Sequence, residues 1–279
     1  MIERPSPPDP EFDDLIETRL RVVTWNIWWR YGPWRQRRPA IAATLRQLDP
    51  DVIALQEVWD DGTGNLAAEL ASELGYHHSY QSAESRDGIG FGNAVLSRWP
   101  IAGSDSRPLY GAKETGEGRG VVFAEVDGPR GPVQVFSTHL NWRFEHSHIR
   151  QKQVGDLARF VASMGPGPYP PILCGDFNAE PTSEEIRMLT GETTGAVEGL
   201  AFRDAWKDGG DGGPGYTWDN VNPFARAGLE PSRRIDYLFV GFPKARGAGH
   251  TVHCRVAGNE PVDGIWPSDH FAVLAELRY

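Results

Sequence analysis

The sequence predicts an α/β fold in one large domain. Short runs rich in β-branched residues alternate with stretches whose apolar residues recur at helical spacing. The chain has 279 residues, of which 39% are hydrophobic, and one large α/β domain can use a chain of this length. We find neither an internal repeat at a constant period nor a linker that would divide the chain.

Strands are predicted where Val, Ile, Leu and aromatic residues dominate a short run. In chain order these runs are residues 21–27, 51–55, 93–96, 121–124, 133–136, 171–174, 235–240, 251–256 and 271–277. Most of them are short and apolar enough to be buried in a sheet.

Helices are expected between some of these strands, where apolar residues share one helical face. The sets are Ile41, Leu45 and Leu48; Leu66, Leu70 and Leu74; and Val154, Leu157 and Val161. Residues 181–185 predict another helix start, capped by Thr182 or Ser183. The Gly-rich segments 207–215 and 241–249 predict long surface loops.

Residues 1–18 differ in character from the rest of the chain. They carry four prolines and several acidic residues without an apolar period. We expect either a mobile arm or a wrap along a strand edge, without a chemical role. A single domain is then expected over residues 19–279.

The composition argues against several classes of protein. No apolar run approaches the roughly 18 residues of a membrane span, and the acidic, proline-rich N-terminus is unlike a secretory signal. Cys174 and Cys254 are too few for a disulfide scaffold and are not clustered as in a zinc site. We therefore expect a cytoplasmic protein without stable membrane association. The net charge of -10 disfavours a broad nonspecific grip on nucleic acid but does not exclude it as a substrate.

Polar residues suited to catalysis recur at the ends of the predicted strands. In chain order they are Asn26, Glu57, His139, Asp176, Asn178, Asp269 and His270. The first three end strands, the next two follow a strand, and the last two directly precede the final strand. Loops at strand ends converge on one crevice in sheets of this kind, so these side chains can form one site.

The residue types indicate the chemistry. An Asn and several carboxylates offer hard oxygen ligands that suit Mg²⁺ or Mn²⁺, whereas zinc or iron would favour Cys or several His. Two histidines can donate protons to phosphate oxygens, which gain charge during phosphoryl transfer. Taken singly, each residue is explained as well by a structural role, such as a turn-forming Asn or a hydrogen-bonded His.

The ordered set of motifs favours a functional site over these structural roles. The motifs are Thr24-Trp25-Asn26-Ile27, Leu55-Gln56-Glu57-Val58, Ser137-Thr138-His139-Leu140, Gly175-Asp176-Phe177-Asn178, Arg234-Ile235-Asp236-Tyr237 and Ser268-Asp269-His270. Over about residues 20–279 the chain resembles the endonuclease/exonuclease/phosphatase superfamily. The resemblance implies a four-layer α/β sandwich, with two mixed β-sheets packed face to face and helices outside. It also implies metal-dependent hydrolysis of a phosphate ester by in-line attack of an activated water.

The resemblance assigns roles to individual residues. Asn26, Glu57 and Asp269 are the implied ligands of Mg²⁺ or Mn²⁺, with Asn26 acting directly, through water or on the nucleophile. Asp176 and Asn178 would orient the attacking water and hold the phosphate, with Asp176 as the candidate base.

The remaining implied roles concern the histidines. His139 and His270 would flank the phosphate, and Asp236 would fix the tautomer of His270. Phe91 stands where many members of the superfamily have a tyrosine. No acidic partner for His139 is apparent, although Asn93 stands where one would be sought.

Contacts to the substrate are expected from residues near these motifs. Trp28, Trp29 and Trp34 lie in a loop that interleaves aromatic residues with arginine, and Trp142 follows His139 closely. Such a loop either stacks a base or another planar group, or forms a packed lid. Arg119 is explained equally well as a phosphate contact and as an ordinary exposed arginine.

Three functions remain open. The leading hypothesis is a phosphodiesterase, nuclease or phosphatase acting on a nucleic acid, a nucleotide or a small phosphoester. The second is a sphingomyelinase-like lipid phosphodiesterase, for which an apolar membrane hairpin would be expected and none is evident. The third is a catalytically silent binding module, which would predict losses among the motif residues. The sequence identifies no protein partner.

Overall fold

The computed structural model describes residues 14–279, so residues 1–13 of the predicted N-terminal arm lie outside the described residues. The described chain contains two six-stranded sheets, with strand orders β11-β12-β1-β2-β4-β3 and β5-β6-β7-β8-β10-β9. Both sheets are mixed, because β1 pairs with β2 and β7 with β8 in parallel, whereas the other neighbours are antiparallel.

The strands of the first sheet are β1 (Arg19–Asn26), β2 (Val52–Asp60), β3 (His77–Arg86), β4 (Ile89–Ser97), β11 (Thr251–Ala257) and β12 (Ala272–Arg278). Those of the second sheet are β5 (Ile101–Pro108), β6 (Gly120–Gly128), β7 (Gly131–His139), β8 (Ile172–Asp176), β9 (Phe202–Asp204) and β10 (Asp236–Gly241). The helical segments are α1 (Trp34–Leu48), α2 (Leu66–Leu74), α3 (Ala112–Thr115), η1 (Phe144–His146), α4 (Ser147–Ser163), α5 (Glu184–Thr190), α6 (Ala205–Gly209), α7 (Pro223–Ala227) and η2 (Ala245–Gly247).

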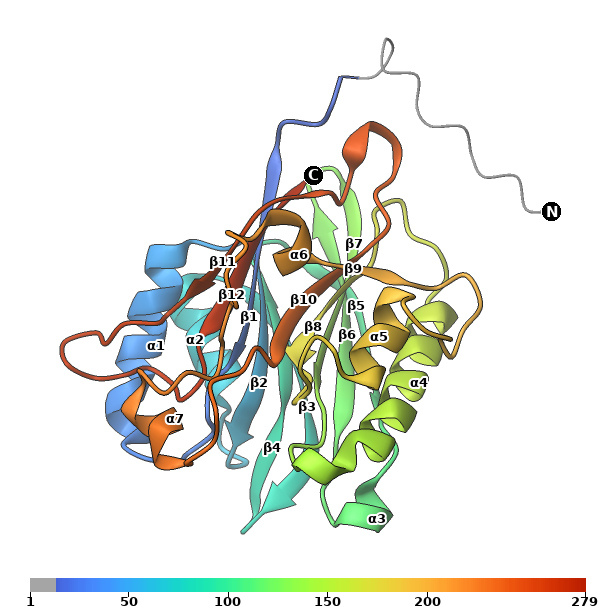
Figure 1. Cartoon of the computed structure of the whole chain (residues 1–279). Helices are drawn as coiled ribbons and strands as arrows, with labels where there is room; N and C mark the ends of the chain where they lie inside the picture. Colours follow the sequence, from blue (N-terminus) through green and yellow to red (C-terminus); the bar gives the residue numbers. More distant parts are fainter. Residues whose placement is uncertain (1–13) are drawn as a thin grey trace.

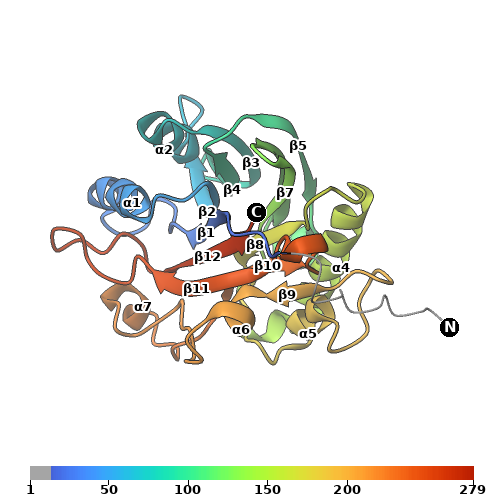
Figure 2. The same cartoon turned by 90° about the horizontal axis from the view of Figure 1, so that it is seen from above.

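The two sheets pack face to face, and helices cover their outer faces, which gives four layers (Figures 1 and 2). Helices α1 and α2 cover the first sheet, and α4 and α5 cover the second. In β1, Val22 contributes to the core between the sheets, whereas Val23 contributes to the core beneath α1 and α2. Burial on both faces explains why the central strands read as continuous apolar runs. The predicted four-layer sandwich is confirmed.

Three strands are absent from the sequence prediction, namely β3, β5 and β9. All three lie at sheet edges, where one side of the strand is unpaired. Edge strands carry polar residues that discourage pairing with other chains, and β9 has only three residues. The apolar pattern that predicts central strands was therefore missing.

The helix predicted from residues 181–185 is α5, and its N-cap is Ser183, which makes no side-chain capping hydrogen bond. The predicted loop at 207–215 is partly helical, because α6 extends to Gly209. Within residues 14–279, none of the helices combines the length and apolarity needed to cross a membrane.

Candidate active site

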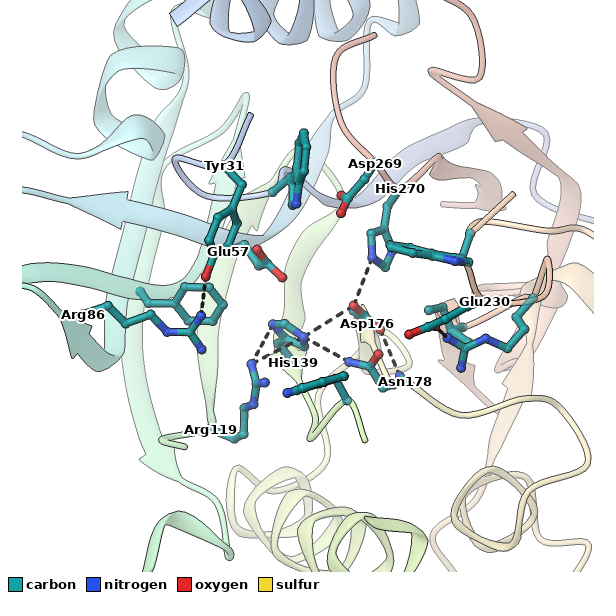
Figure 3. A pocket seen from close by; sticks show the side chains of 16 residues that line it. Tyr31, Glu57, Arg86, Arg119, His139, Asp176, Asn178, Glu230, Asp269 and His270 are labelled. Carbon is teal, nitrogen blue, oxygen red and sulfur yellow. Dashed lines mark hydrogen bonds and ion pairs between the residues drawn. The ribbon is translucent and has the colours of Figure 1, made fainter. Parts of the chain in front are cut away.

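One pocket of about 290 Å³ collects most of the predicted site residues (Figure 3). Its lining includes Trp28, Glu57, Arg119, His139, Trp142, Asp176, Asn178, Asp269 and His270. Asn26 and Asp236 are buried and do not line the pocket, but each is hydrogen-bonded to a residue that does. The fold thus brings the strand-end residues of both sheets together.

Glu57 lines the pocket where β2 is irregular. We expected β2 to end at Glu57, but the strand continues to Asp60, and its register against β4 shifts between Leu55 and Val58. Glu57 adopts a left-handed conformation with φ 56°. A non-glycine residue there costs about 1–3 kcal/mol, and such strain collects at functional sites.

Asn26, at the end of β1, joins two carboxylates of the pocket. Its Nδ2 donates to Glu57 Oε1 at 3.1 Å and to Asp176 Oδ2 at 3.0 Å. Its Oδ1 accepts a hydrogen bond of 3.0 Å from the backbone N–H of Trp28. Both ends of the amide are therefore engaged. Glu57 Oε2, in contrast, is buried without a hydrogen-bond partner among the residues that the structure describes.

Asp176 ends β8 and begins a tight turn. Asn178 has φ 50°, and its backbone N–H donates to Asp176 Oδ1 at 2.9 Å. Gly175 is needed before Asp176 because a Cβ there would lie 2.2 Å from the Thr138 carbonyl oxygen. Burial, followed by the charge of Asp236, raises the pKa of Asp176 to about 7.

His270 is held between two buried carboxylates. Its Nδ1 lies 2.9 Å from Asp236 Oδ2. Its Nε2 lies 3.7 Å from Asp176 Oδ2, a contact that Figure 3 marks with a dashed line. Burial by itself lowers the pKa of His270, but Asp236 and Asp176 outweigh it and raise the pKa well above its ordinary value. The imidazolium therefore donates from Nδ1 to Asp236 and presents a second N–H towards Asp176.

His139, at the end of β7, is held differently. Arg119 Nη1 lies 3.1 Å from His139 Nδ1. Because arginine only donates, Nδ1 is the acceptor in this contact, while Nε2 lies 3.4 Å from Asp176 Oδ2. Asn178 Nδ2, which is also a donor, lies 3.1 Å from this Nε2 and donates to the Leu140 carbonyl oxygen. A neutral imidazole accepts at only one of its two nitrogens, so Arg119 and Asn178 compete for that role. Burial, followed by the charge of Arg119, lowers the pKa of His139 well below its ordinary value.

The partner of His139 is thus a cation, and Asn93 is not that partner. Asn93 Nδ2 donates to the Gly120 carbonyl oxygen at 2.9 Å. Arg119 is buried and is fixed by Glu117 Oε2 at 3.1 Å, so it is not an ordinary exposed arginine. Its position in the pocket explains why no acidic partner for His139 was found in the sequence.

The acidic residues of the pocket fit a divalent cation. Burial raises the pKa of Asp269 to about 7; His270 opposes this shift and Glu57 adds to it. Together with the unpartnered Oε2 of Glu57, this describes two carboxylates whose charge is poorly compensated. Mg²⁺ or Mn²⁺ would supply the missing charge to such oxygen donors.

A second group of possible ligands lies beside the first. One ligand atom from each of Asp176, Asp236 and His270 lies within 4.8 Å of the others. In this group Asp236 is already hydrogen-bonded to His270, whose raised pKa favours the protonated ring. A protonated imidazole nitrogen cannot bind a metal, so Glu57 and Asp269 are the better matched pair.

Two of the predicted aromatic contacts line the pocket. Trp28 packs on Phe224 with ring centroids 4.7 Å apart. Trp142 is 46% exposed, and its Nε1 donates to Glu117 Oε1 at 2.9 Å. Because Glu117 also binds Arg119, it connects the exposed indole ring of Trp142 to the residue that contacts His139.

Trp29 and Trp34 do not line the pocket, contrary to the sequence prediction. Trp29 Nε1 donates to the Gly90 carbonyl oxygen at 2.8 Å. Trp34 packs edge-on against Trp59 with ring centroids 5.8 Å apart, and both rings lie under Arg30. The loop after Asn26 therefore presents one indole to the pocket and uses the other two for packing.

Sequence reasoning missed several lining residues, which are Tyr31, Arg86, Trp218, Glu230, Arg233 and Ile235. Arg86 belongs to the edge strand β3 and donates to the Tyr31 hydroxyl at 2.7 Å. Its guanidinium lies 4.1 Å from the centroid of the Phe91 ring. A signal existed for three of them: Ile235 belongs to the Arg-Ile-Asp-Tyr motif, Arg233 precedes it, and Tyr31 lies in the aromatic loop after Asn26. Arg86, Trp218 and Glu230 offered none, because they follow no predicted strand.

Comparison with known proteins places this geometry in a family. Residues 23–270 match the family model described as "Endonuclease/Exonuclease/phosphatase family". This range contains every predicted catalytic and metal-binding residue. Truncated TDP2 from Caenorhabditis elegans has the same fold, with a TM-score of 0.73, 23% sequence identity, and coverage of 95% of this chain and 100% of that chain.

Two curated relatives cover most of this chain. A putative neutral sphingomyelinase of Drosophila melanogaster is 25% identical over 296 residues, which span 95% of this chain and 62% of the relative. A 5'-tyrosyl-DNA phosphodiesterase of Caenorhabditis elegans is 26% identical over 273 residues, which span 94% of this chain and 68% of the relative. The chain therefore spans less than two thirds of the length of the first relative.

Proposed function

Because the chain belongs to the endonuclease/exonuclease/phosphatase family, we propose that it is a divalent-metal-dependent phosphodiesterase whose substrate carries a nucleobase. One observation carries the proposal. The same pocket holds the acidic pair Glu57 and Asp269, in which Glu57 Oε2 has no partner among the described residues, the hydrogen-bonding residues around Asp176, and the indole rings of Trp28 and Trp142. Acidic ligands suit the metal, and indole rings suit a planar group next to the phosphate.

Glu57 and Asp269 would hold Mg²⁺ or Mn²⁺. The bound cation would polarise the phosphoryl oxygens and offset the negative charge of the reacting phosphate. Asn26 has its Oδ1 engaged by the Trp28 backbone, and its Nδ2 donates to Glu57. These contacts support a role for Asn26 in orienting the Glu57 carboxylate over a role as a direct ligand.

The other buried residues move and hold protons. Asp176 lies at the centre, bound to Asn26 and within 3.7 Å of both His139 and His270. We assign to Asp176 the acceptance of a proton from the attacking water, with Asn178 fixing the turn that carries it. The imidazole rings of His139 and His270 would donate hydrogen bonds to phosphate or leaving-group oxygens.

The substrate proposal draws on the walls of the pocket and on one relative. Trp142 is exposed yet fixed by Glu117, so it can stack a base with little loss of side-chain freedom. The relative named 5'-tyrosyl-DNA phosphodiesterase supports a nucleic-acid end as the substrate class. A net charge of -10 favours a short segment held in the pocket over a long duplex held by phosphate contacts.

A substrate panel tests this proposal. The panel compares single-stranded and duplex oligonucleotides, p-nitrophenyl phosphate, bis(p-nitrophenyl) phosphate and sphingomyelin vesicles in Mg²⁺ or Mn²⁺. We expect the highest kcat/KM on a single-stranded oligonucleotide, and loss of activity in Glu57→Gln. A clear preference for the monoester or for vesicles would reject a nucleic-acid diester as the substrate.

A lipid phosphodiesterase is the second candidate, because apolar side chains are exposed near the pocket. Phe144 is 55% exposed, follows Trp142 closely and lies under the guanidinium of Arg233, which lines the pocket. Such residues could contact a lipid surface. The sphingomyelin arm of the panel distinguishes this candidate from the first.

A further inference from the structure

Arg37 on α1 is a buried arginine whose hydrogen bonds all go to backbone carbonyl oxygens. Its side chain is only 1% exposed. The carbonyls that accept from its guanidinium belong to Ile27, Trp28, Trp29, Tyr31 and Pro267. The first four lie in the loop after Asn26, whereas Pro267 lies two residues before Asp269. One side chain therefore connects the loops next to two predicted metal-site residues.

The loop after Asn26 needs such a connection because its backbone is strained. Trp28 and Trp29 have φ values of 58° and 35°, in the left-handed region that non-glycine residues avoid. The Trp28 ring lies 4.7 Å from the Arg37 guanidinium. On another side it meets Gly32, where a Cβ would lie 2.6 Å from the ring. The carbonyls of this loop turn inward to one guanidinium, which stabilises the strained conformation.

The charge of Arg37 also links it to the acidic pocket. Burial lowers the pKa of Arg37 to about 10, while Asp269 and Glu57 oppose this shift, so the side chain stays cationic at neutral pH. No carboxylate hydrogen-bonds to it among residues 14–279. A buried cation with only carbonyl partners is costly unless acidic groups lie nearby. The pair Glu57 and Asp269 meets that requirement.

We infer that Arg37 is a positioning residue that couples the geometry of the metal site to the placement of Trp28 at the substrate pocket. Arg37 fixes the loop after Asn26 against the segment before Asp269. It thereby keeps Glu57, Asp269 and Trp28 at fixed positions relative to one another. Metal affinity and substrate affinity should therefore both depend on a residue that contacts neither ligand. This inference depends on the metal site proposed above.

Arg150 on α4 offers a matched comparison. It is also buried, with Nε 2.6 Å from Glu185 Oε1, and it donates to the carbonyls of Asn141, Arg143 and Phe144. The loop that it holds carries Trp142 but none of the predicted metal ligands. Substitution of Arg150 should therefore disturb one pocket wall and leave the metal site intact.

The test compares Arg37→Lys with Arg150→Lys in the full chain. Lysine keeps the charge but cannot reproduce the planar fork that reaches several carbonyls. Mn²⁺ binding is measured by isothermal titration calorimetry, and kcat and KM are measured by steady-state kinetics on an oligonucleotide. Both measurements are made at a temperature at which melting curves show each variant to be folded. We expect Arg37→Lys to raise the Kd for Mn²⁺ about tenfold or more and to raise KM. Arg150→Lys should raise KM while leaving the Kd for Mn²⁺ unchanged.

The outcomes separate the inference from the proposed function. If the unmodified protein binds Mn²⁺ and Arg37→Lys binds it equally well, Arg37 is only structural and the inference fails. If the unmodified protein does not bind Mn²⁺, the proposed function fails first. If Arg37→Lys does not fold, Gly32→Ala provides a second test that leaves Arg37 in place. Its Cβ would displace the Trp28 ring, which packs on the Arg37 guanidinium. Unchanged Mn²⁺ affinity in a folded Gly32→Ala protein, with KM raised, would also reject the coupling.

Discussion

Asp236 Oδ2 lies 2.9 Å from Nδ1 of His270, and both side chains are buried. This pair fixes the orientation of the imidazole and leaves its Nε2 directed towards Asp176. A carboxylate in this position stabilises the protonated ring and selects which nitrogen faces the substrate. The relationship predicts that Asp236 affects turnover without contacting the substrate.

Asp236→Asn should lower kcat by about 10²–10⁴ and change KM little, because the amide keeps the shape but not the charge that supports the imidazolium. Steady-state kinetics on the best oligonucleotide substrate measure both constants. Asp105→Asn serves as the control, since Asp105 lies on the edge strand β5 and pairs with Arg107 on the surface. If Asp236→Asn and Asp105→Asn lower kcat equally, Asp236 has no specific role in supporting the His270 imidazolium.

The histidines should divide into two classes. His139→Ala and His270→Ala should each lower kcat by orders of magnitude, because both rings line the pocket near Asp176. His146→Ala and His148→Ala should have much smaller effects, since these rings lie at η1 and the start of α4, outside the pocket. A loss in His146→Ala as large as that in His270→Ala would show that the residue assignment is wrong.

The tryptophans should separate substrate contact from packing. Trp142→Ala should raise KM by a factor that corresponds to about 1–3 kcal/mol if the ring stacks a base, with little change in melting temperature. Trp34→Ala should lower the melting temperature instead, because its ring packs against Trp59 outside the pocket. Melting curves and KM values for both variants provide the check. An unchanged KM in Trp142→Ala would argue against stacking on this ring.

Gly175→Ala should destabilise the fold by roughly 1–3 kcal/mol, as overpacked interiors do. The added Cβ would lie 2.2 Å from the Thr138 carbonyl oxygen, across the β7–β8 pair that carries His139 and Asp176. Gly103→Ala is the matched control, because a Cβ on that glycine of β5 meets nothing within 4 Å. Chemical denaturation measures both. If the two variants have equal free energies of unfolding, the β7–β8 pair accommodates the added Cβ beside the Thr138 carbonyl oxygen without loss of stability.

Much of the fold and of the reaction class could be predicted from the sequence. Central strands such as β1 and β8 are buried on both faces, so they appear as apolar runs, and the polar residues that end them mark the site. The family assignment was predicted from six motifs and is confirmed, and metal-dependent hydrolysis of phosphate esters is the activity of that family. The division into residues 1–18 and 19–279 and the cytoplasmic location stay predictions.

The details of the site could not be predicted because they depend on contacts between distant residues. The cationic partner of His139 is 20 positions away in the chain, and Arg86 comes from an edge strand without an apolar pattern. The bulge that turns Glu57 into the pocket arises from the register of β2 against β4. The loop after Asn26 looked like a row of equivalent tryptophan contacts, whereas Arg37 and the backbone angles place only Trp28 of the three tryptophans in the pocket.

Metal dependence is decided by one titration of purified protein with a phosphodiester substrate. After treatment with EDTA, the protein should be inactive, and Mg²⁺ or Mn²⁺ should restore hydrolysis along a saturable curve. Glu57→Gln should stay folded and remain inactive at all metal concentrations, because its amide removes the charge of the carboxylate that carries the unpartnered Oε2. Hydrolysis that persists after complete chelation, or that Glu57→Gln retains in full, is incompatible with a metal centre at Glu57 and Asp269.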